Sequence, residues 1–299
     1  MRVRYAHCTR ATPARRRSPL RIVTTVSLRP ADLRRYRRAV LRPFKVRTAG
    51  QCRRFVDTLG FCYAFTAGPG AIPGLFDVIG TRSIDRMWSW AWTWKDSLVT
   101  RRQVYYGRVL RRKPTFISLA YVPHFYALSG NVGEPDDYLV AYEAGHLTLL
   151  ARELYEQVAR RGPVNTWELR RQFVSGDDSG SRLHRALDEL QERFLIAKVA
   201  EVEGRGNYAY IWDTFSRWMP EVSRQAARIT SDEAAGAVLR GYLKIVGAAT
   251  PQQVADLFRW PPSLLEPAAD RAGALEATLD GERYWTLPAM VRARRPSER

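Results

Sequence analysis

The stretch SRLHRALDELQERFLIAKVAEVEGRGNYAYIW, residues 181–212, decides the fold class of this chain. Its first half repeats apolar side chains at helical spacing. Its second half has two short apolar runs around the glycine-containing segment 203–207, which predicts a β-hairpin. Upstream, a helix is expected from His146 to just before Gly162, and Thr166 begins a shorter one. Three helices followed by a hairpin are typical of a winged helix, whose third helix fits the major groove of DNA.

The same order of elements is expected again near the C-terminus. Ser231 is placed to cap a helix that ends at Gly247. Thr250 and Pro251 then begin a second helix, because proline is well tolerated in the first turn. A third helix precedes a hairpin over residues 278–287, so the chain contains a second copy of the same plan.

We therefore expect an α+β fold that is mainly α-helical, with tandem winged-helix units and short β-hairpin wings. Helices beginning at Pro30 and after Thr48 would form the core of the first unit. The expected domains are a basic N-terminal arm (1–29), a first winged-helix unit with a tryptophan-rich insert (30–140), a second winged-helix domain (141–220), and a third with a short basic tail (221–299).

The charge of the chain indicates a polyanionic partner. The formal net charge is +18, and residues 1–60 hold 17 Arg and Lys against 2 acids, a surplus of 15. Alternatively, the positive charge reflects an arginine-rich composition of the whole chain. That explanation accounts for the total number of arginines better than for their clustering in residues 1–60. We expect double-stranded DNA as the partner. The expected contacts are Arg34, Arg38, Arg53, Arg54, Arg182, Arg185 and Arg205.

Other features exclude several classes of protein. No apolar run reaches the ~18 residues that a membrane helix needs, and the N-terminus lacks the apolar stretch of a secretory signal. Cys8, Cys52 and Cys62 have no metal-ligand spacing and cannot all pair. We expect a cytoplasmic, nucleoid-associated protein without metal or cofactor, and a monomer is favoured.

Trp88, Trp90, Trp92 and Trp94 alternate with other residues in the predicted insert. A period of two places all four rings on one face of an extended segment. That face is either buried in the core or forms a wall on which bases stack, as in proteins that extrude a base. The remaining alternative is a helix, which would scatter the rings around its axis.

The chain resembles the AlkZ/YcaQ-type winged-helix DNA glycosylases of bacteria, which excise alkylated or crosslinked bases. The resemblance spans roughly residues 30–288 and includes the order of the three units. It also rests on LGFCYAF at 59–65, at the end of the helix that follows Thr48, and on GYL at 241–243 with GAATP at 247–251.

In that family, the segment after the first unit's helix carries a Gln-x-Gln or Gln-x-Asp pair that positions or activates the hydrolytic water. The matching positions here are Tyr63 and Phe65. Neither is a general base near neutral pH, because a phenol titrates near about 10 and a phenyl ring has no proton to exchange. The resemblance therefore implies a divergent member that lacks the usual pair.

Asp96 is a candidate replacement for the pair, because its carboxylate lies in an aromatic and basic stretch of sequence. Alternatively, Asp96 caps a helix starting at Ser97 or forms an ion pair with Arg101 or Arg102. These alternatives assign it a structural role.

Two hypotheses of function follow. The first is a DNA-repair or lesion-binding protein related to the glycosylases, with altered or lost base-excision activity. The second is a winged-helix transcription regulator. The aromatic, Arg-rich segment 66–140 favours the first, because it lies between DNA-binding units like a pocket for a base, whereas a regulator needs a dimerisation element.

Overall fold

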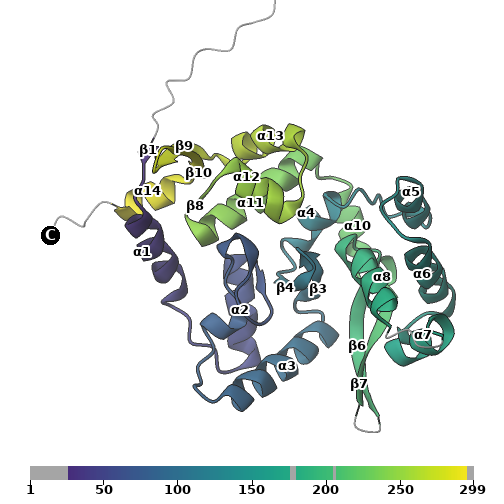
Figure 1. Ribbon diagram of the computed structural model, residues 1–299. Helices are drawn as coiled ribbons and strands as arrows, with labels where there is room; N and C mark the ends of the chain where they lie inside the picture. Colours follow the sequence, from purple (N-terminus) through teal and green to yellow (C-terminus); the bar gives the residue numbers. More distant parts are fainter. Residues whose placement is uncertain (1–25, 176–179, 205–206, 295–299) are drawn as a thin grey trace, which may run out of the picture.

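The computed structural model describes residues 26–175, 180–204 and 207–294 (Figure 1). Over these residues the chain is an α+β protein that is mainly helical, as the sequence predicted. The elements are β1 (Val26–Ser27), α1 (Pro30–Leu41), α2 (Ala49–Leu59), β2 (Phe61–Tyr63), η1 (Pro69–Ala71), η2 (Leu75–Asp77), α3 (Ile84–Thr100), β3 (Tyr105–Leu110), β4 (Lys113–Ile117), α4 (Val122–Ala127), α5 (Asp137–Glu143), α6 (Leu149–Arg161), β5 (Val164–Asn165), α7 (Thr166–Phe173), α8 (Ser181–Glu192), β6 (Ile196–Gly204), β7 (Asn207–Thr214), α9 (Phe215–Trp218), α10 (Pro220–Ala226), α11 (Ser231–Val246), β8 (Ala248–Ala249), α12 (Pro251–Phe258), α13 (Pro262–Ala272), β9 (Leu275–Leu279), β10 (Glu282–Thr286) and α14 (Pro288–Arg294).

The same pattern of strands occurs in three places along the chain. The strand orders are β2-β4-β3, β5-β7-β6 and β1-β9-β10-β8, so in each sheet the last strand in sequence pairs with a strand on either side. We call the segments that contain these sheets unit one (α2 to β4), unit two (α6 to β7) and unit three (α11 to β10). In units two and three, helix, strand, two helices and a hairpin follow one another in the same order.

The tryptophan-rich segment is helical, so the expected extended face is wrong. Trp88, Trp90, Trp92 and Trp94 all lie in α3, which Ser83 caps by accepting a hydrogen bond from the backbone of Arg86. The buried positions of α3 are spaced as one face of a helix: Ala91, Trp94, Lys95, Leu98 and Val99. A lysine within this stripe obscured its helical period in the sequence. The segment is therefore the α-helix that precedes the β3–β4 hairpin of unit one.

Helix α1 packs away from the partner that the sequence suggested. It was expected to form the core of the first unit with α2, but it lies against α11 and α14. The Tyr36 hydroxyl donates to the Lys244 carbonyl at 3.0 Å, and the Arg37 guanidinium donates to the Val246 carbonyl at 2.9 Å. Strand β1 also pairs in parallel with β9. Residues 26–41 therefore extend unit three.

One side chain joins unit one to unit three. The Tyr121 ring, at the start of α4, lies between Gly60 at the end of α2 and Gly241 in α11. A Cβ atom would lie 2.6 Å from the ring at Gly60 and 2.8 Å from it at Gly241. Phe61 packs edge-on against Tyr121, with ring centroids 5.7 Å apart. Both glycines are thus required for this contact, and Gly60 also has a φ of 87° that favours glycine.

Gly241→Ala should destabilise the fold by about 1–3 kcal/mol, because the added methyl overlaps the Tyr121 ring in a packed core. Gly50→Ala is the matched control: it also lies in a helix, but a Cβ there meets nothing within 4 Å. The control should be neutral or stabilising by up to about 1 kcal/mol, since alanine favours helix. Urea unfolding measures both changes, and equal stability of the two variants would exclude the Tyr121 contact as a constraint.

Candidate functional site: an aromatic surface beside a buried charge cluster

Helix α3 presents exposed aromatic rings to one side. Trp88 and Trp92 are four residues apart and 41% and 37% exposed. Phe65, from the loop after β2, lies between them, with ring centroids 5.4 Å from Trp88 and 5.5 Å from Trp92. Tyr208 of β7, 36% exposed, meets Trp92 edge-on at 5.5 Å. We call Phe65, Trp88, Trp92 and Tyr208 the aromatic surface.

The other two tryptophans of α3 lie elsewhere. Trp90 and Trp94 stack on each other with ring centroids 5.3 Å apart, and Trp94 is buried in the core. The alternation seen in the sequence thus separates into two pairs on a helix. One pair supports the core, and the other contributes to the aromatic surface.

Asp96 lies within α3, beside the aromatic surface, and is held by charges from two units. Its Oδ1 atom accepts from the Lys95 ammonium at 2.8 Å, from the Lys198 ammonium of β6 at 2.5 Å, and from the Tyr208 hydroxyl at 2.7 Å. The sequence suggested a helix cap or a pair with Arg101 or Arg102, and both expectations are wrong. The β6–β7 hairpin supplies two of the actual partners, and a sequence gives no sign of contacts so distant along the chain.

The two lysines of this cluster are fully buried, at 0% exposure. Lys198 also pairs with Glu201 at 2.6 Å. Lys95 donates to the hydroxyls of Tyr208 at 2.9 Å and Tyr210 at 3.1 Å, and its ammonium lies 4.0 Å from the centre of the Trp92 ring. Aromatic faces and hydroxyls thus replace the water that a buried ammonium loses.

The ionisation of this cluster follows from its burial. Burial, with the nearby Lys198 ammonium, lowers the pKa of Lys95 to about 7. Burial alone would raise the pKa of Asp96, but the hydrogen bonds from Lys198 and Lys95 outweigh it and hold that pKa below its usual value. Burial and the hydrogen bond to Asp96 raise the pKa of Tyr208. Asp96 is therefore a carboxylate, and Tyr208 keeps its proton.

A cleft of about 670 Å³ opens next to these groups, lined by residues of α3 and of the β6–β7 hairpin that include Trp92, Asp96, Arg101 and Tyr208. This volume suits a small ligand or a single base. All three contacts of Asp96 go to Oδ1, so within the described part of the chain Oδ2 has no protein partner. The arrangement offers an aromatic face for stacking and one carboxylate oxygen for a polar contact.

The family resemblance in the sequence predicted that Tyr63 and Phe65 occupy the positions of the catalytic pair, and these two side chains lie in different surroundings. Tyr63 is the last residue of β2 and is buried in the core, where its hydroxyl donates to the Pro69 carbonyl at 3.2 Å. Burial raises the pKa of Tyr63. Phe65 belongs to the aromatic surface. Neither side chain can act as a base. Only Phe65 lies at a surface where a ligand can contact it.

The arginines predicted to bind DNA lie on several helices. The described ones are exposed: Arg34 and Arg38 on α1, Arg53 and Arg54 on α2, and Arg182 and Arg185 on α8. Arg53 pairs with Asp57 at 3.3 Å on the helix surface. Arg205 lies outside the described residues. The structure thus leaves these six guanidinium groups accessible.

Sequence reasoning missed Lys95, Lys198 and Tyr208. A lysine in the buried stripe of α3, and another within the apolar run of β6, were the available signals, since a buried lysine needs a partner. Over the described residues, no three His, Cys, Asp or Glu side chains gather as a metal site, and no helix has the length and apolar character to cross a membrane.

These features define a mainly helical α+β protein with a fold seen in a DNA glycosylase. The structure of the Streptomyces sahachiroi DNA glycosylase AlkZ matches with a TM-score of 0.55 and 17% sequence identity, over 89% of this chain and 72% of that chain. A model of the AlkZ-related family matches residues 46–259. This chain belongs to the AlkZ-related family. No curated protein matches its sequence.

The pKa of Lys95 can be tested through the pH dependence of stability. Its value of about 7 lies below the 10.5 of an ordinary lysine, so between these values the unfolded chain binds more protons and the free energy of unfolding rises with pH. The comparison runs from pH 7 to about pH 9.5, because free tyrosine begins to lose its proton above this range. Over this range the free energy of unfolding of wild type should rise by at least ~1 kcal/mol more than that of Lys95→Met.

Urea unfolding at several pH values measures this difference. Lys113→Met is the matched control, because Lys113 is an exposed lysine at the start of β4, and it should follow the wild-type curve. Parallel pH curves for wild type and Lys95→Met would contradict the lowered pKa.

Proposed function

We propose that this chain is a DNA-binding protein that acts in DNA repair, recognises damaged or unpaired bases through the aromatic surface, and has lost base excision by the usual chemistry of its relatives. The single observation that carries the proposal is Phe65. It lies where the family resemblance places a water-positioning residue, and it packs between two exposed tryptophans. An aromatic stacking group thus replaces a polar one at this position.

The repeated topology supports DNA binding by tandem winged helices. In each unit the final hairpin follows a helix, α3, α8 or α13, that corresponds to the third helix of a winged helix. On this assignment, α8 presents Arg182 and Arg185 to the major groove, and the β6–β7 hairpin is the wing. The aromatic surface then joins the third helix of unit one to the wing of unit two.

The charge distribution supports duplex DNA as the partner. Residues 1–60 hold a surplus of 15 positive charges. Arg34, Arg38, Arg53 and Arg54 leave their guanidinium groups exposed on α1 and α2, where phosphates can reach them. A protein of this kind acts on DNA in the cytoplasm, and its three units are sufficient for a monomer to bind.

The aromatic surface suits a base that has left the duplex stack. Stacking on an aromatic side chain contributes about 1–3 kcal/mol per base and tolerates any base. The cleft beside it holds one ionised carboxylate, Asp96, whose Oδ2 can accept a hydrogen bond from a base. Hydrogen bonds from Lys198 and Lys95 hold the pKa of this carboxylate below its usual value, which makes it a weak base.

Replacing Trp88 and Trp92 with leucine should weaken binding to a duplex with one unpaired base more than binding to a fully paired duplex. Loss of stacking on one base predicts a decrease of about five-fold to 100-fold in affinity for the first duplex. Trp90→Leu is the control, because its ring faces away from the aromatic surface. Fluorescence anisotropy gives both affinities. Equal losses for the two duplexes would exclude base stacking.

Wild-type protein should release almost no base from a duplex that contains N7-methylguanine, while it still binds that duplex. A well-placed acid or base typically contributes about 10²–10⁴ in rate, and neither Tyr63 nor Phe65 can take that role. Alkaline cleavage of the abasic product provides the measurement. Substantial excision by wild type that Asp96→Asn abolishes would overturn the proposal and make Asp96 a catalytic residue.

A further inference from the structure

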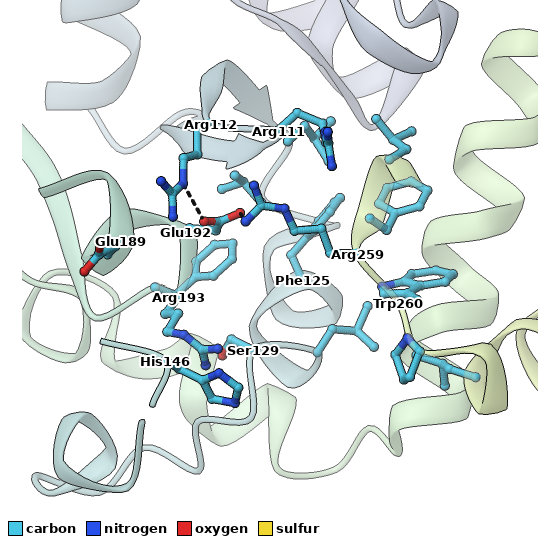
Figure 2. A pocket seen from close by; sticks show the side chains of 18 of the residues that line it. Arg111, Arg112, Phe125, Ser129, His146, Glu189, Glu192, Arg193, Arg259 and Trp260 are labelled. Carbon is cyan, nitrogen blue, oxygen red and sulfur yellow. Dashed lines mark hydrogen bonds and ion pairs between the residues drawn. The ribbon is translucent and has the colours of Figure 1, made fainter. Parts of the chain in front are cut away.

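A second cleft lies where the three units meet, apart from the aromatic surface (Figure 2). Its volume is about 630 Å³, within the range of sites for small molecules. The β3–β4 turn of unit one, the end of α8 in unit two, and the segment between α12 and α13 in unit three all line it. Unlike the first cleft, it contains several arginines.

Most charged groups of this cleft are already paired. Glu192 bridges Arg112 at 3.2 Å and Arg259 at 2.6 Å. Glu189 accepts from the backbone and hydroxyl of Thr148, at 3.1 and 2.8 Å, and so caps α6. The two acids of the cleft therefore have hydrogen-bond partners of their own.

Arg193 is the exception. Within the described part of the chain its guanidinium has no hydrogen bond or ion pair with another side chain. It is half-buried, and this burial lowers its pKa despite the nearby Glu192. Figure 2 shows it beside Ser129 and His146, at one end of the cleft. The Ser129 hydroxyl donates to the Tyr126 carbonyl at 2.7 Å, which leaves the guanidinium and the exposed imidazole of His146 to bind an anion that accepts several hydrogen bonds.

The opposite wall of the cleft is apolar and aromatic. Trp260 stacks on Phe258 with ring centroids 4.7 Å apart, and Phe125 and Leu264 lie in the same lining. Figure 2 shows Trp260 across the cleft from Arg193, with Phe125 between them. A ligand that fills the cleft therefore needs an anionic end and a flat apolar end.

We propose that this cleft binds a nucleoside monophosphate unit, with its phosphate at Arg193 and His146 and its base against the wall formed by Phe125 and Trp260. A tetrahedral phosphate can accept from the guanidinium and the imidazole together. A free nucleotide and a nucleotide within a DNA strand share this chemistry. The site shares none of these residues with the aromatic surface, so it does not depend on duplex binding there.

Isothermal titration with deoxyguanosine monophosphate tests the proposal. Wild type should bind it more tightly than either inorganic phosphate or deoxyguanosine, because each fragment fills only one end of the cleft. Arg193→Gln should reduce the affinity about tenfold or more, through loss of a charged hydrogen bond. Arg228→Gln is the matched control, because Arg228 is exposed on the surface and does not line the cleft.

A second variant guards against misfolding of Arg193→Gln. His146 is exposed, so His146→Gln should leave the thermal stability unchanged and still weaken nucleotide binding several-fold. A single-stranded oligonucleotide that competes with the mononucleotide in wild type, but not in Arg193→Gln, would identify DNA as the source of the ligand. If the oligonucleotide does not displace the mononucleotide from wild type, the cleft is a site for a small molecule.

Absence of deoxyguanosine monophosphate binding by wild type at millimolar concentration would overturn the proposal. Equal affinity of wild type and Arg193→Gln would overturn it as well. Duplex affinity should be measured in parallel. Trp88 and Trp92 lie outside this cleft, so a protein that binds the duplex but not the nucleotide would contradict this proposal and leave the proposed function intact.

Discussion

The Tyr121 ring occupies space that exists only because residues 60 and 241 have no Cβ atom. Through this contact the end of α2, the start of α4 and the middle of α11 come close enough for their aromatic residues to share one core. Phe61 contacts Tyr121, Phe125 and Phe258 within that core, so elements from units one and three and the connection between them pack as one body. The second cleft lies at the edge of the same packing.

The second organising feature is the charge cluster between α3 and the β6–β7 hairpin. Burying Lys95 and Lys198 is costly, and the contacts with Asp96, Glu201 and the tyrosine hydroxyls offset that cost only in one arrangement. The cluster therefore fixes the position of the hairpin relative to α3. This in turn places Tyr208 against Trp92 and completes the aromatic surface.

The proposed function is consistent with both features. Excision by general-base chemistry needs a group that can take a proton from water, whereas here Tyr63 is buried, Phe65 packs against tryptophan, and hydrogen bonds from two lysines lower the pKa of Asp96. The aromatic surface instead offers rings on which a flat group such as a base can stack. The proposed function therefore assigns to this family member the recognition of an extruded base without the usual chemistry.

Local signals in the sequence predicted the mainly helical α+β class, the helices that begin after Thr48 and at Thr250, and the C-terminal hairpin of β9 and β10. These features depend on residues close together in the chain, where propensity and periodicity act. The cap expected at Ser231 is wrong by one position, because the Thr230 hydroxyl accepts from the Glu233 backbone and caps α11. The sequence also identified Phe65, Asp96 and the tryptophans as residues of interest. It did not predict how they come together.

Tertiary packing decided the rest. Alternation of tryptophan predicted an extended segment, but burial of Ala91, Trp94, Leu98 and Val99 on one face favours the helix α3. Helix α1 packs against unit three, because contacts with Lys244 and Val246, more than 200 positions away, satisfy its polar side chains. Two partners of Asp96 likewise come from the two strands of the β6–β7 hairpin, at separations of 102 and 112 positions. Such pairings depend on the summed packing of the whole chain, which no local pattern of residues encodes.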